Sequence, residues 1–257
     1  METQCLQVEV TDHVATVTLN RPPVNAQNTA LRLEIAALFD SFNDRDDVRV
    51  AILTGAGRVF SAGADIKERG AIDAEAGGFW QHSRRVREAG NSIRECAKPV
   101  IAAVNGAALG AGVSLAASCD IIVASDEAVF GMPEIDIGLA GGAALINSMF
   151  GKSVGREMFF TGKRLPAAEL YRLGVISACV PPDELMPKAR EIAAEIASKS
   201  PIGMRYAKMS YNTIETMPPR DGYRFEQNMT HALSKTEDAK EAQRAFLEKR
   251  KPAFKGR

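Results

Sequence analysis

The sequence has little of what a metalloprotein or a disulfide-stabilised secreted domain needs. Its 257 residues include four cysteines, at positions 5, 96, 119 and 179, and three histidines, at positions 13, 82 and 231. The cysteines form no Cys-x-x-Cys pair and no zinc-ligand spacing with histidine, so they predict reduced thiols in a cytoplasmic protein. Three histidines so far apart in the sequence also do not indicate a metal site built from histidine.

Neither sign of charge dominates, and long apolar runs are absent. Lys and Arg number 32, as do Asp and Glu, so the net charge is zero. This balance disfavours a strongly basic nucleic-acid binder and an acidic disordered tail. No run approaches the ~18 apolar residues of a membrane span. The first five residues lack the basic and apolar blocks of a secretory signal. We therefore expect a folded cytoplasmic protein without a nucleic-acid or membrane partner.

The hydrophobic pattern predicts an α/β core followed by a helical region. Apolar and polar residues alternate in patches over 6–19 and are interrupted at Asp12 and His13, which predicts two strands joined as a hairpin. After Asn28, a candidate helix cap, apolar residues recur at helical spacing. We place the core at residues 1–196 and a C-terminal helical region at 197–257. Further strands are expected at 48–53, 100–106, 121–124 and 128–130, and helices at 76–96, 113–118, 185–196, 201–216, 220–234 and 236–250.

Two glycine-rich turns, Ser61–Asp65 and Gly110–Gly112, each follow a predicted strand and precede a helix. Free backbone N–H groups gather at such positions, and two converging turns could hold a thioester oxygen as it becomes an enolate. Tight strand-to-helix packing explains the glycines equally well. Neither turn has the spacing of a P-loop or of the dinucleotide-binding fingerprint.

Charged residues supply further candidates. Glu134 is flanked by Met132, Ile135 and Ile137, and an apolar setting would raise its pKa toward the range of a general acid or base. A solvated loop carboxylate is the plainer alternative, and Asp136 is a weaker candidate of the same kind. Cationic residues that could meet phosphate, or that merely form a solvated face, are Lys67, Arg69 and the run Lys249–Lys251.

Three stretches together resemble the crotonase family, the enoyl-CoA hydratase/isomerase superfamily: LTGAGRVFSAGADIKE, KPVIAAVNGAALGAGVSLAASCDIIVAS and AVFGMPEIDIGLAGG. The tail AFLEKRKPAF fits the same family, so the resemblance covers essentially the whole chain. It implies an α/β spiral of ββα units, a helical C-terminal region used in assembly, and a homotrimer that can stack into a hexamer. It also implies an acyl-CoA thioester substrate, with no cofactor besides the CoA that the substrate carries.

The resemblance also assigns roles to individual positions. The N–H groups of Ala64 and Ala111 would form the oxyanion hole, and Gly142 would keep space beside the reacting carbons. The second oxyanion position is commonly glycine in the family, so the Ala111 methyl group adds bulk near the thioester. CoA would lie along Ala62, Ala64, Asp65, Ile66 and Lys67, with Lys249 reaching its phosphate, from a neighbouring subunit in some arrangements.

The family's hydratases carry two catalytic glutamates. Glu134 matches the second, and Ser114 stands at the position of the first. Three mechanisms fit a lone glutamate: hydration of a 2-enoyl-CoA with Ser114 holding water, Δ3-Δ2 isomerisation with Glu134 as the sole base, and cleavage of another thioester-activated bond. Feruloyl-CoA hydratase-lyases also have serine here, but Arg69 and Phe225 replace their phenol-binding tyrosines. A non-catalytic protein of this fold, binding CoA or RNA or serving as a scaffold, is a further alternative. We expect the segment from Arg69 to Glu88 to shape the acyl pocket.

Overall fold

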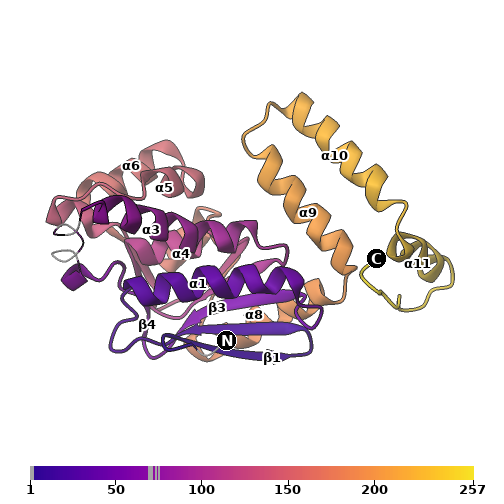
Figure 1. Ribbon diagram of the computed structural model, residues 1–257, viewed down its shortest axis with the longest axis horizontal. Coiled ribbons are helices and arrows are strands. Elements are labelled where there is room, and N and C mark those ends of the chain that lie inside the picture. The colour runs from indigo at the N-terminus through magenta and orange to yellow at the C-terminus, as the bar shows by residue number, and fades with distance from the viewer. Residues whose placement is uncertain (1–2, 69–71, 73, 75) are drawn as a thin grey trace.

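The computed structural model describes residues 3–68, 72, 74 and 76–257. Two sheets form its core (Figure 1). The larger sheet has the order β1-β2-β3-β5-β7-β10, and the smaller has the order β4-β6-β8-β9. The strands are β1 (Leu6–Thr11), β2 (Val14–Leu19), β3 (Val50–Gly55), β4 (Val59–Ser61), β5 (Val100–Val104), β6 (Ala107–Leu109), β7 (Ile121–Ser125), β8 (Val129–Gly131), β9 (Arg164–Pro166) and β10 (Ala178–Val180).

Consecutive strands divide between the two sheets in a repeating order. Strands β3, β5 and β7 join the larger sheet, while β4, β6 and β8, each following directly, join the smaller. A helix follows each pair, so the chain advances as a spiral of ββα units and the expected fold is confirmed. The core helices are α1 (Thr29–Ser41), α3 (Gly78–Glu95), α4 (Ala111–Ala117), α5 (Ala143–Met149), α6 (Lys152–Thr161), α7 (Ala167–Arg172) and α8 (Pro182–Ala197), with short 3₁₀ helices η1 (Phe42–Asp44), η2 (Ile66–Glu68) and η3 (Pro133–Ile137).

The first elements follow local sequence signals. Strands β1 and β2 pair antiparallel around a two-residue turn, in which Asp12 and His13 have φ of 50° and 66°. Positive φ at both central positions gives the turn the twist that a tight hairpin needs. Helix α1 begins after Asn28, whose side chain accepts a 2.9 Å hydrogen bond from the N–H of Leu31. The predicted hairpin and the predicted helix cap are both confirmed.

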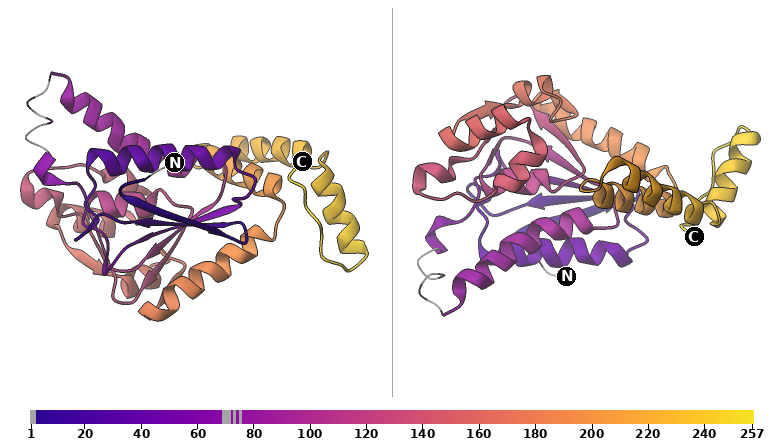
Figure 2. Two further views of the ribbon diagram at one scale, coloured as in Figure 1. Left: turned by 60° about the horizontal axis from the view of Figure 1, so that its bottom comes forward. Right: turned by 90° about the horizontal axis from the view of Figure 1, so that it is seen from above.

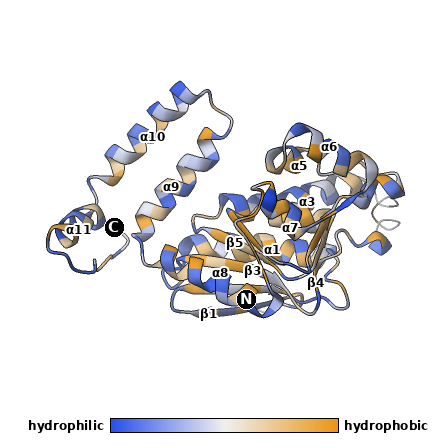
Figure 3. Cartoon of the chain, turned by 180° about the vertical axis from the view of Figure 1, so that it is seen from behind, coloured by the Kyte–Doolittle hydropathy of each residue, from blue (hydrophilic) through white to orange (hydrophobic). Residues whose placement is uncertain are grey.

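The central strands β3, β5 and β7 of the larger sheet are buried on both faces, which explains their nearly continuous apolar sequences. Side chains alternate across a strand, so Val50 and Ile52 face one way and Ala51 and Leu53 the other. The first pair belongs to a core cluster with α8, and the second to the main cluster, which also includes residues of α1 and α3. Strands β3 and β5 are accordingly coloured hydrophobic in Figure 3, whereas much of α10 is hydrophilic.

Three C-terminal helices form an arm that projects from the core (Figures 1 and 2). Lys208 anchors its first helix: the buried ammonium ion lies 2.8 Å from Asp120 and donates to the carbonyls of Ile93 and Lys98. The expected boundary at 196/197 stays a prediction; α8 ends at Ala197 against the sheet. The arm helices are α9 (Pro201–Ile214), α10 (Pro219–Leu233) and α11 (Glu237–Leu247).

Two local expectations differ from the structure. Residues 107–109, which lie between the predicted strand at 100–106 and the second glycine-rich turn, form strand β6, because their backbone pairs with β4 and β8, partners that are distant in sequence. The turn after β4 leads into the three-residue 3₁₀ helix η2 rather than directly into a long helix.

Candidate functional site

The two glycine-rich turns meet at one place in the fold. Gly63 has φ of 94°, and a side-chain carbon added to it would lie 2.7 Å from the carbonyl oxygen of Leu109 and 3.4 Å from the backbone nitrogen of Ala111. Only glycine permits this approach, because of both its backbone angle and the contact. The two expected oxyanion donors lie at this meeting point: Ala64 directly follows Gly63, and Ala111 supplies the backbone nitrogen nearest to it. The predicted convergence of the turns is therefore present.

Gln27 joins the two turns and was not singled out from the sequence. It is buried, and its backbone forms a parallel bridge with Ala64: its N–H donates to Gly63 at 2.7 Å, and its carbonyl accepts from Asp65 at 3.0 Å. Its side-chain amide donates a 2.8 Å hydrogen bond to the carbonyl of Ala111. No periodicity marks a polar residue in this segment as buried, so only the tertiary contacts identify it.

Glu134 lies against the second turn. It follows β8, whose Gly131 carbonyl accepts a 2.8 Å hydrogen bond from the N–H of Gly110. A side-chain carbon on Gly110 would fall 1.9 Å from Oε1 of Glu134, so the missing side chain provides the space for the carboxyl group. Its Oε2 is buried and has no hydrogen-bond partner among the described residues. A carboxyl oxygen held in this way is free to bind a proton or a water molecule.

Burial raises the pKa of the Glu134 carboxyl, and the N–H groups of Glu134 and Ala111 partly oppose that rise. The direction agrees with the expectation from sequence, but the expected cause needs correction. Of the three apolar neighbours, Met132 is buried, whereas Ile135 and Ile137 are 41% and 53% exposed and contribute little to the burial of the carboxyl group. On the 3₁₀ helix η3 they face outward, and burial comes instead from tertiary contact with the turn at Gly110.

Ser114 and Gly142 come together near the start of α4. Ser114 lies on α4 three residues after Ala111, so the two share a face of that helix. A side-chain carbon on Gly142 would be 3.6 Å from Oγ of Ser114 and 2.6 Å from Cε of Met132. Gly142 also has φ of 92°. The structure thus gathers the expected Ser114, Gly142 and Glu134 around the start of α4.

The expected CoA-contacting residues follow the first turn, and their side chains differ in exposure. Ala64, Ile66 and Lys67 are exposed. Asp65 pairs instead with Arg21 at 2.6 Å and accepts a hydrogen bond from the backbone of Lys67. Burial opposes the charged form of Asp65, but the backbone hydrogen bond from Lys67 and the guanidinium group of Arg21 outweigh it, so the pKa of Asp65 is lowered. Its carboxylate therefore shapes the turn.

Two sequence candidates are placed apart from this group. Arg69 lies outside the described residues. Lys249 follows α11 on the arm, which projects away from the end of the core that carries β4 and η2 (Figures 1 and 2). Within one chain, Lys249 is therefore not brought to the other candidates. Its φ of 53° marks a sharp bend at the end of α11.

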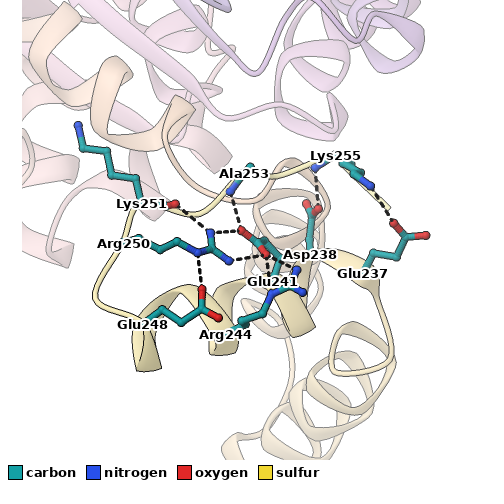
Figure 4. Close-up of polar contacts among 9 residues, drawn as sticks. All are labelled: Glu237, Asp238, Glu241, Arg244, Glu248, Arg250, Lys251, Ala253 and Lys255. Carbon is teal, nitrogen blue, oxygen red and sulfur yellow. Dashed lines mark hydrogen bonds and ion pairs between the residues drawn. The ribbon is translucent and has the colours of Figure 1, made fainter.

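The chain after Lys249 folds back onto α11 (Figure 4). The Glu241 carboxylate accepts hydrogen bonds from the guanidinium groups of Arg250 and Arg244 and from the N–H of Ala253. These partners hold the pKa of Glu241 far below its ordinary value. Asp238 accepts from the N–H of Lys255 at 2.7 Å. The tail that carries Lys249 is thus fixed by two acidic residues of α11.

Residues 3–68, 72, 74 and 76–257 contain no group of three or more His, Cys, Asp or Glu side chains arranged to hold a metal ion. Within the same residues, no helix has both the length and the apolar character of a membrane span.

Comparisons with known proteins agree with this arrangement. The sequence profile of the enoyl-CoA hydratase/isomerase family matches residues 9–257. A probable enoyl-CoA hydratase of Rhizobium meliloti is 38% identical over the full length of both chains, and the carnitinyl-CoA dehydratase of Citrobacter koseri is 38% identical over 94% of each. The crystal structure of an enoyl-CoA hydratase from Bacillus anthracis superposes with a TM-score of 0.92 at 34% identity, covering 99% of this chain and 100% of that one. The chain is therefore a member of the enoyl-CoA hydratase/isomerase family, the crotonase superfamily, to which its spiral fold and converging turns belong.

Proposed function

We propose that the protein hydrates a 2-enoyl-CoA thioester to the 3-hydroxyacyl-CoA, with Glu134 as its single catalytic carboxyl group. The observation that carries this proposal is the position of that group. It occupies the space at Gly110, next to Ala111, and has a buried oxygen without a partner among the described residues. Ser114 lies one helical turn beyond Ala111, where its hydroxyl can hold a water molecule.

Each residue has a defined part in this reaction. The thioester oxygen accepts hydrogen bonds from the N–H groups of Ala64 and Ala111. Glu134 takes a proton from water as the water oxygen bonds to C3, and the electrons of the C2–C3 double bond move to C2 and the thioester oxygen. Glu134 then returns the proton to C2. Each oxyanion donor typically contributes ~3 kcal/mol, and a general acid/base typically 10²–10⁴ in rate.

Δ3-Δ2-enoyl-CoA isomerisation is the second candidate, and the serine at position 114 favours it. An isomerase moves one proton between C4 and C2, so it needs one base near the enolate and no second acid. Glu134 alone meets that requirement. Hydration is preferred because the Ser114 hydroxyl can position water and because the relatives described above are named as a hydratase and a dehydratase.

In this proposal CoA lies along the exposed turn that includes Ala62, Ala64 and Ile66, with Lys67 and Lys249 toward its phosphates. The reaction needs no metal or redox cofactor, because the two N–H groups carry the charge of the enolate. The proposed location of the enzyme is the cytoplasm.

The arm supports the proposal of a homotrimer, which could stack into a hexamer. Several of its large apolar side chains are exposed in the single chain, and water contact with so many is costly unless a partner covers them. Analytical ultracentrifugation would test this: a mass near three or six times 27.7 kDa is expected, and a monomer would refute it. These side chains are Tyr211, Met217, Tyr223, Phe246 and Leu247.

The deciding experiment is incubation with crotonyl-CoA in heavy-oxygen water, followed by mass spectrometry of the thioester, with Glu134→Gln in parallel. A gain of one labelled water that the variant abolishes is expected. If no label enters, while a 3-enoyl-CoA is converted in deuterated water, the isomerase is the correct assignment. CoA-thioester binding by calorimetry without turnover would instead indicate a non-catalytic CoA-binding protein, and no binding would indicate a scaffold.

A further inference from the structure

We infer that Gln27 is a positioning residue that holds both oxyanion N–H groups in register. This inference rests on the proposed function, because it concerns the N–H groups of Ala64 and Ala111. Gln27 is 3% exposed, and it is separated from Ala111 by 84 residues in sequence. Its backbone is hydrogen-bonded to the first turn, and its side chain is hydrogen-bonded to the second.

The backbone of Gln27 sets the direction of the first donor. Its N–H donates to the carbonyl of Gly63 at 2.7 Å, and that carbonyl belongs to the same peptide unit as the N–H of Ala64. In a planar trans peptide the two groups point in opposite directions. Fixing the Gly63 carbonyl toward Gln27 therefore aims the Ala64 N–H away from it. The bond from Asp65 to the Gln27 carbonyl, at 3.0 Å, fixes the other side of Ala64.

The side chain of Gln27 sets the position of the second donor. Its amide nitrogen donates a 2.8 Å hydrogen bond to the carbonyl of Ala111 and lies 3.4 Å from Oγ of Ser61. Ser61 in turn donates to the carbonyl of Asn25. The amide thus ties the first residue of α4 to the strand that leads into the first turn. Losing this bond would leave the turns joined by backbone packing, where Gly63 approaches Leu109 and where Gly112 approaches Ser61.

Oxyanion stabilisation depends on donors that are fixed before the charge forms, so a small displacement weakens catalysis more than binding. The test is Gln27→Met, which keeps the length and the backbone bonds but removes the amide donor. We expect kcat to fall about tenfold with KM changed little, as for an interaction made mainly in the transition state. The matched control is Asn28→Ala, which removes the cap on α1 and costs stability without touching either turn.

A second readout separates this inference from the assignment of the reaction. Butyryl-CoA labelled with ¹³C at its carbonyl cannot react, and its infrared carbonyl band shifts to lower frequency when two N–H groups polarise it. We expect a smaller shift in Gln27→Met than in the natural protein and in Asn28→Ala. Gln27 has no positioning role if Gln27→Met keeps the full band shift and kcat, or if Asn28→Ala loses as much of both. If the natural protein does not hydrate crotonyl-CoA, but its band shift is still larger than that of Gln27→Met, only the hydratase proposal is overturned.

Discussion

The carboxyl group of Glu134 occupies the place of a side chain that Gly110 does not have. The two residues are 24 positions apart, and a carbon added to Gly110 would lie 1.9 Å from Oε1 of Glu134. The same glycine has φ of 52° and precedes Ala111, the second expected oxyanion donor. One glycine therefore provides both the turn into α4 and the space for the candidate acid/base.

Replacing Gly110 with alanine should impair activity and stability together. The new methyl group displaces the Glu134 carboxyl, and a backbone with φ of 52° and ψ of −119° costs about 1–3 kcal/mol for a residue with a side chain. We expect activity to fall about 10²-fold or more, as when a general acid/base is lost. Rate measurements and urea unfolding would check this. Gly151→Ala is the control, because nothing lies within 4 Å of its added carbon, and it should behave normally.

Glu134→Gln should lower turnover by ~10²–10⁴ because the amide can neither take nor return a proton. The fold should persist, since the amide has nearly the same shape. Asp136→Asn on the same 3₁₀ helix is the matched control, because Asp136 is exposed. Initial rates on crotonyl-CoA and on a 3-enoyl-CoA are the measurement. Near-normal turnover of the true substrate by Glu134→Gln would show that another group carries the proton.

Ser114→Ala should distinguish the two reactions. Removing the hydroxyl deprives a hydratase of its water-holding group but leaves an isomerase with its base and its oxyanion donors. We expect a severe loss of hydration and a mild loss of any isomerisation, measured on the two substrates. Thermal unfolding must first establish that the variant is folded. A large loss of isomerisation in a folded variant would contradict this distinction.

The acidic limb of the pH–rate profile should reflect Glu134. Burial raises the pKa of this carboxyl in the free protein, so kcat/KM should rise with pH through an apparent pKa above the ordinary glutamate range. Glu134→Gln should lose that limb from any residual activity. A limb centred at or below the ordinary range would contradict the assignment.

The same shift predicts how stability depends on pH. The folded protein retains the Glu134 proton to a higher pH than the unfolded chain does. This carboxyl group therefore favours folding fully below its unfolded pKa, and that contribution is lost as pH rises through the raised pKa. Urea unfolding of the natural protein and of Glu134→Gln across this window would measure the contribution as a difference. A difference that grows in favour of the natural protein with rising pH would have the wrong sign.

Lys208→Met should loosen the arm from the core. It leaves Asp120 without its ammonium partner, and the carbonyls of Ile93 and Lys98 without a donor. Removing one partner of a buried pair should cost about 2–4 kcal/mol here, since Asp120 keeps some water contact. Urea unfolding would measure the loss. Adding Asp120→Asn should recover part of it, and equal losses in the single and double variants would argue against coupling.

Much of the fold could be predicted from the sequence because the responsible signals are local. The hairpin around Asp12 and His13 and the cap at Asn28 depend on residues a few positions apart. Strand β6 and the division of strands between two sheets could not be predicted from pattern, because three-residue strands owe their pairing to distant partners. The family resemblance supplied the spiral that periodicity alone did not.

The sequence by itself determined which chemical groups are available: one glutamate at position 134, a serine at position 114 and two glycine-rich turns. Only the tertiary structure decided what surrounds them. It turned Ile135 and Ile137 outward, buried Glu134 against Gly110, and placed the amide of Gln27 on the carbonyl of Ala111. The physical reason is that burial and hydrogen-bond direction are set by residues 24 to 84 positions away, and no local pattern records such contacts.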